Sequence, residues 1–158
     1  MKIFPTKELN FKLIDDQAET LNRLNRRTDK SENLTSQLTD KSFRGIINGN
    51  EFKLISSAIG KGAFCVMIGA IEVDKGNVKV EIHKAFRILL SIILCFPIIA
   101  ILIAILIGKE EPNPIFILVV IGHILIIRYA FIGLAFKYLS RESLNRLRDV
   151  LDFEWIKN

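Results

Sequence analysis

Two long apolar runs lie close together in the second half of this chain. Residues 88–108 contain no charged side chain, and a second run at 115–136 begins after a turn of six residues. About 20 residues of α-helix, rising roughly 1.5 Å each, cross the ~30 Å hydrocarbon core of a bilayer. The pattern therefore predicts a transmembrane helical hairpin over residues 88–136.

Basic residues beside the two runs predict the orientation of this hairpin. Lys84 and Arg87 flank the first run, and Lys137 and Arg141 flank the second, whereas the turn holds one lysine and two glutamates. Lysine and arginine near span ends stay in the cytoplasm, so we expect both termini inside and the turn outside. The basic inner flank favours anionic lipid head groups. The N-terminal residues lack the apolar stretch that a cleavable signal peptide needs.

The 87 residues before the hairpin predict a cytoplasmic α+β domain. Alternation at residues 10–14 indicates a short strand, and Asp15 or Asp16 is expected to cap a helix that follows. The apolar face of that helix would hold Ala18, Leu21 and Leu24. The polar residues 31–42 fit a loop, a helical turn or an edge strand.

The dipeptide Asn48-Gly49 predicts a β-hairpin between residues 43–47 and 50–56. Asn-Gly supplies the positive φ angles of a type I′ turn, whose twist matches that of the flanking strands. The strand signals continue beyond this hairpin, so it is expected to open an antiparallel sheet.

Two further strands are expected before the first span. The nearly continuous apolar segment 63–73 suits a buried central strand and is too short to cross a membrane. Residues 74–77 predict a turn, and clean alternation at 78–84 predicts the last strand. The result is a small antiparallel β-meander with one or two helices. Only residues 85–87 then separate the last strand from the first span. This connection is either a short anchor or a link that transmits a tilt of the sheet to the first transmembrane helix.

Small residues predict a packing face on the membrane hairpin. They recur at intervals of four as Ala100, Ala104 and Gly108, and Gly122 on the second span lies at about the depth of Ala100. Small side chains let helix backbones approach closely within a membrane. The face would serve either the partner span or a second copy of the protein, so a homo-oligomer is one expectation.

Three other residues in the apolar runs are candidates for a functional role. Pro97 frees the carbonyl of Ile93, and Arg128 lies at a similar depth on the second span. Arg128 is therefore expected either to bond that carbonyl and tie the spans together, or to extend to the inner head groups. His123 is either a proton-sensitive, pore-lining group or a neutral imidazole bonded between helices.

Residues 137–158 predict a cytoplasmic amphipathic helix after the second span. Its apolar line consists of Leu144, Leu147, Leu151 and Trp155. Ser140 or Ser143 is expected to cap its start. The helix would lie on the inner membrane surface, pair with another subunit, or pack onto the meander; the small front domain favours the last of these.

The sequence carries no motif typical of an enzyme, a cofactor or a metal site. Cys65 and Cys95 are placed by the expected topology in different compartments, which makes a disulfide unfavourable. The net charge is +5, but the basic residues are mixed with acidic ones rather than gathered in a stripe, so nucleic acid is not an expected partner.

One resemblance rests on the pattern Phe43-x-Gly45-x-Ile47 and Phe52-x-Leu54, followed by an apolar strand and the tight hairpin. In this layout residues 43–136 resemble small, uncharacterised bacterial membrane proteins with two spans. The resemblance brings no known active site and implies little about activity. The expected location is a bacterial inner membrane. The favoured function is a non-enzymatic, membrane-anchored module that binds or senses a protein or small ligand. The alternative is a toxin-like or defence-type effector that forms an oligomeric pore.

Overall fold

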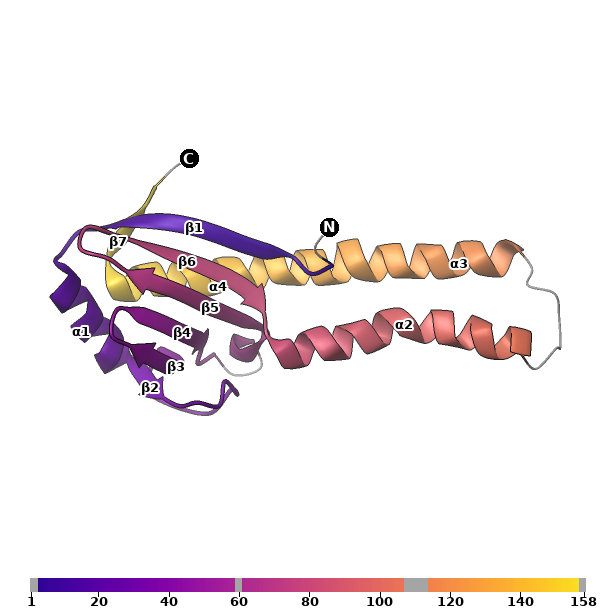
Figure 1. Ribbon diagram of the computed structural model, residues 1–158, viewed down its shortest axis with the longest axis horizontal. Coiled ribbons are helices and arrows are strands. Elements are labelled where there is room, and N and C mark those ends of the chain that lie inside the picture. Colours follow the sequence, from indigo (N-terminus) through magenta and orange to yellow (C-terminus); the bar gives the residue numbers. More distant parts are fainter. Residues whose placement is uncertain (1–2, 59–60, 107–113, 157–158) are drawn as a thin grey trace. The chain divides into compact units, whose positions relative to one another are not determined.

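The structure, a computed structural model, describes residues 3–58, 61–106 and 114–156 (Figure 1). The chain divides into two compact units. The sheet unit consists of Met1–His83 together with Phe136–Asn158, and the hairpin unit consists of Lys84–Ala135. The polypeptide therefore leaves the sheet unit once and returns to it, so that both ends of the chain belong to the same unit.

The described part of the sheet unit contains a mixed sheet of seven strands, in the order β2-β3-β4-β5-β6-β1-β7. Its strands are β1 (Thr6–Leu13), β2 (Thr28–Lys30), β3 (Phe43–Asn48), β4 (Glu51–Ser56), β5 (Cys65–Ile71), β6 (Lys75–Ile82) and β7 (Phe153–Trp155). Strands β3 to β6 form the expected antiparallel meander, with β5 in the middle. The fold class is α+β as predicted, but a purely antiparallel sheet was wrong because β2 pairs with β3 in parallel.

Strands β1, β2 and β7 extend the sheet beyond the predicted meander. The strand expected at residues 10–14 begins earlier, at Thr6, and pairs with β6 and β7. Strands β2 and β7 contain three residues each, too few to show a period of two. Their place in the sheet is fixed by partners far away in the sequence, which local patterning does not reveal.

The β3–β4 hairpin is confirmed, but its turn differs from the predicted one. Asn48 pairs with Glu51, which leaves Gly49 and Asn50 as the two turn residues. Gly49 has a φ of 60°, whereas Asp152 is the only non-glycine residue with positive φ among those described. A positive φ confined to the first turn residue fits a type II′ turn. The predicted type I′ turn at Asn48-Gly49 was therefore wrong by one position.

The turn predicted at residues 74–77 was also wrong. Strand β5 ends at Ile71 and β6 begins at Lys75, so Gly76 lies within a strand. Gly76 pairs with Phe11, and a Cβ on Gly76 would lie 2.3 Å from a carbon of the Phe11 ring. The glycine makes room for an aromatic ring rather than for a turn.

Helix α1 (Gln17–Arg27) begins as predicted, with Asp16 as its N-cap. The Asp16 carboxylate accepts a hydrogen bond from the backbone N–H of Glu19 at 2.7 Å. Of its predicted apolar face, Leu24 is fully buried and Leu21 is partly buried, whereas Ala18 is exposed. Residues 31–42, for which three alternatives were open, have no regular structure, and Leu34 packs there against Ile55 and Val66.

Helix α4 (Leu134–Leu151) completes the core of the sheet unit and runs behind the sheet in Figure 1. Its buried side chains are Phe136, Ser140, Ser143, Leu144, Leu147 and Leu151. The apolar face of the C-terminal helix therefore packs onto the sheet, which is the alternative that the sequence favoured. Trp155 does not continue that face, because it lies in β7. Ser140 and Ser143 are interior helix residues, so neither is a cap.

The hairpin unit is helical throughout its described part. It contains α2 (Lys84–Leu106), α3 (Pro114–Leu125) and η2 (Ile126–Gly133), a π-helix that continues into α4. A short 3₁₀ turn, η1 (Gly62–Phe64), lies in the sheet unit. Two helices are long and apolar enough to cross a membrane. The expected connector 85–87 is the first turn of α2, so only His83 separates sheet and helix.

Candidate functional site

A cleft of about 880 Å³ opens in the sheet unit beside the last turns of α1 and α4. We call it the α1–α4 cleft. Its lining residues are Arg23, Arg26, Arg27, Asp40, Lys41, Ser42, Asp149, Val150 and Asp152. Pockets for small molecules are typically about 300–1,000 Å³ in volume, so this cleft has the size of a ligand site. Its walls are mostly charged, which favours a polar ligand over an apolar one.

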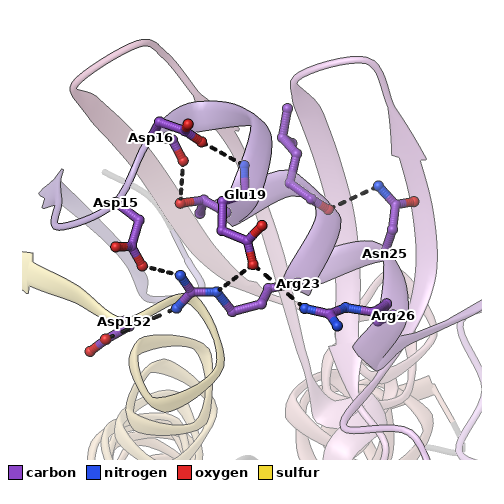
Figure 2. Close-up of polar contacts among 9 residues, drawn as sticks. Asp15, Asp16, Glu19, Arg23, Asn25, Arg26 and Asp152 are labelled. Carbon is purple, nitrogen blue, oxygen red and sulfur yellow. Dashed lines mark hydrogen bonds and ion pairs between the residues drawn. The ribbon is translucent and has the colours of Figure 1, made fainter.

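Arg23 is held in place by acidic residues from two parts of the unit (Figure 2). Its guanidinium donates a hydrogen bond to Asp15 and lies 3.8 Å from Glu19 and 4.0 Å from Asp152. The hydrogen bond to Asp15 is the main cause that raises the pKa of Arg23 above its usual value. Arg23 is therefore a permanently charged residue that joins α1 to the end of α4.

Asp152 adopts a backbone conformation that is unusual for its residue type. It follows α4 directly with a φ of 55°, and its N–H donates to the carbonyl of Arg148 at 2.8 Å. Glycine is the usual residue at this position after a helix. Here a carboxylate occupies it and reaches Arg23 across the cleft.

The remaining cations of the cleft form fewer ion pairs and hydrogen bonds than Arg23 does. Arg26 lies 3.6 Å from Glu19, and both side chains are exposed. Within residues 3–58, 61–106 and 114–156, the side chains of Arg27 and Lys41 have no ion pair or hydrogen bond. These two positive charges are therefore available to a ligand.

No protein-family model, curated protein or solved structure matches this chain.

The two cysteines differ in their surroundings. Cys65 is fully buried at the start of β5, and burial raises the pKa of its thiol to about 12. The thiol is therefore protonated at neutral pH and is a poor nucleophile and metal ligand. Cys95 lies in α2, and neither cysteine is in a disulfide. The described residues hold no group of three metal-ligating side chains.

The structure places the predicted intramembrane residues on three helical segments. Arg128 lies in η2, with its guanidinium carbon 5.6 Å from the centre of the Tyr129 ring. His123 lies near the end of α3, and Pro97 lies inside α2 without ending that helix. The tie between Arg128 and the Ile93 carbonyl stays a prediction, as does the role of His123.

The predicted small-residue face also stays a prediction. Ala100 and Ala104 lie in α2 and Gly122 lies in α3, whereas Gly108 is outside the described residues. A Cβ on Gly122 would meet no heavy atom of the described residues within 4 Å. As far as the described residues show, the surface at Gly122 is open.

Sequence reasoning missed the α1–α4 cleft. Arg23, Arg26 and Arg27 lie at helical spacings of three and four, a pattern that is visible in the sequence but is also typical of a solvated helix face. Lys41 and Asp152 join them only through the fold. The arginine spacing was thus the one local signal of this site.

Proposed function

We propose that this protein is an integral protein of a bacterial inner membrane that carries a non-enzymatic binding or sensing module on its cytoplasmic side. The hairpin unit would be the anchor, and the sheet unit would be the module. The proposal includes both termini in the cytoplasm and contact of the basic flanks with anionic head groups.

The observation that carries this proposal is the composition of the sheet unit. It contains the segments on both sides of the hairpin, Met1–His83 and Phe136–Asn158. A single folded core lies in one compartment, so a hairpin unit that spans a membrane would cross it an even number of times. Lys84, Arg87 and Lys137 then favour the cytoplasm as that compartment.

We expect cysteine labelling to reveal this topology. Asn113→Cys places a thiol in the turn, and Asn145→Cys places one on the exposed face of α4. Both variants carry Cys95→Ala, and Cys65 is retained because its buried thiol is unreactive. A membrane-impermeant maleimide should label the first variant in intact spheroplasts and the second only after lysis.

The two positions control for each other, because each is exposed to reagent in only one compartment. Labelling of Asn145→Cys in intact spheroplasts would place the module outside. Recovery of the chain in the soluble fraction would refute the membrane anchor itself.

The second candidate function, an oligomeric effector that perturbs the membrane, is favoured by η2. Eight consecutive π-helical residues, Ile126–Gly133, are unusual, and π-helical segments occur frequently at functional sites. Arg128 lies within this segment. In this proposal Arg128, His123 and Pro97 would line a path formed by several copies.

Membrane potential separates the two candidate functions. If the binding module is correct, induced expression in bacteria should leave the potential and growth unchanged. Rapid depolarisation that is lost in Arg128→Leu, but retained in the matched variant Arg141→Leu outside the apolar run, would favour the effector instead. Depolarisation by both variants would point to a general effect of overexpression.

A further inference from the structure

We propose that the α1–α4 cleft binds a phosphate-bearing anion, which Arg27 and Lys41 hold from two sides. This inference rests on the proposed binding module and names the chemical class of its ligand.

Ion pairs engage only some of the charged residues that line the α1–α4 cleft. Asp149 lies 3.3 Å from Arg148, and Asp152 lies 4.0 Å from Arg23, so two of the three lining carboxylates already have a guanidinium beside them. Neither Arg27 nor Lys41 forms an ion pair with a carboxylate among the described residues. The residues that line the cleft comprise four cations and three acids, so the net charge of the lining is positive.

Lys41 lines the cleft from outside helix α1. Arginines in the last turn of α1 interact favourably with the carbonyl end of that helix, which by itself accounts for Arg26 and Arg27. Lys41 belongs to a different segment, so the helix does not explain its position. The Ser57 hydroxyl donates to the Lys41 carbonyl, and the Ser57 N–H donates to the Ser42 carbonyl at 3.1 Å. Ser57, the residue that follows β4, thus holds the backbone of Lys41 and Ser42 at the cleft.

The cationic side chains of the cleft match the chemistry of a phosphate group. A guanidinium offers parallel N–H donors that match two phosphate oxygens, and an ammonium adds a compact charge. Ser42 lines the same cleft, which at about 880 Å³ is large enough for a nucleotide or a lipid head group. Both of these ligands present the same phosphate chemistry.

The test uses the full chain in nanodiscs of neutral phosphatidylcholine, titrated with inorganic pyrophosphate in a calorimeter. We expect binding that Arg27→Ala and Lys41→Ala each weaken by about tenfold or more, the loss expected for one charge-assisted contact. Lys12→Ala is the matched control, because Lys12 is exposed in β1 and does not line the cleft. Its affinity for pyrophosphate should equal that of the native chain.

A second arm identifies the source of the phosphate. Phosphatidic acid in the nanodisc should weaken pyrophosphate binding if a lipid head group occupies the cleft, and Arg27→Ala should abolish this competition. Unchanged binding would indicate a soluble phosphate compound, and either result supports the proposed class. The absence of pyrophosphate binding to the native chain, in nanodiscs with and without phosphatidic acid, would overturn the proposal. An equal loss in Lys12→Ala would do the same. The cysteine-labelling pattern is independent of these results, so failure here leaves the anchored module standing.

Discussion

Phe11→Ala is expected to destabilise the sheet unit by about 3–5 kcal/mol, the range for truncating a buried phenylalanine. The Phe11 ring is fully buried. It stacks on Phe153 with ring centres 4.1 Å apart, and the Trp155 ring meets its edge at 6.3 Å. It also fills the space above Gly76. One side chain thus joins β1, β6 and β7, so its loss should release β7 as well as leave a cavity.

The single tryptophan of the chain makes this result measurable. Trp155 lies in β7, so its fluorescence in urea reports directly on the strand that Phe11 holds. With a urea dependence of about 1–3 kcal/mol per molar, the midpoint should fall by about 1 M or more. Lys12→Ala, on the neighbouring exposed residue, should shift stability by less than about 0.5 kcal/mol. Equal midpoints for Phe11→Ala and Lys12→Ala would contradict this account of the core.

The sequence predicts elements whose signals are local and fails where long-range packing decides. The strand alternation of Val78, Val80 and Ile82 is visible in the sequence, and all three side chains are buried. The Asp16 cap and the two apolar helices are local signals of the same kind. Strand β7 differs, because Trp155 continues a helical pattern in the sequence. The helix ends at Leu151 because Asp152 turns the chain with positive φ, and stacking on Phe11 then recruits the tail to the sheet.

The candidate site illustrates the same limit. A helix surface with three arginines is usually solvated, and nothing local distinguishes Arg23 from its neighbours. Its role depends on Asp15 before the helix and on Asp152 at the far end of the chain, and the cleft exists only where these segments meet. The candidate residues in the apolar runs are the opposite case: Arg128 is conspicuous in the sequence because a charge within an apolar run would be costly in a membrane.

Gly45→Ala is expected to reduce stability by about 3 kcal/mol or more, because a disallowed backbone angle and a backbone clash combine there. Gly45 has a φ of 150°, and a Cβ would lie 2.1 Å from the Lys53 carbonyl oxygen on β4. The strand cannot move aside, since the Gly45 carbonyl accepts a hydrogen bond from the Ser31 N–H at 3.0 Å on its other edge.

Gly49→Ala is the matched control for this prediction. Gly49 also has positive φ, at 60°, but a Cβ there would meet no heavy atom of the described residues within 4 Å. The free energy of unfolding of the control should therefore fall by only about 1–2 kcal/mol, the penalty for a left-handed backbone at a residue with a Cβ. Urea unfolding followed by Trp155 fluorescence gives the two free energies, and amide exchange at Ser31 reports on the β2–β3 contact. A larger loss in Gly49→Ala than in Gly45→Ala would show that the clash at β4 is relieved. In that case the close approach of β3 and β4 would not explain the glycine in the Phe43-x-Gly45-x-Ile47 pattern.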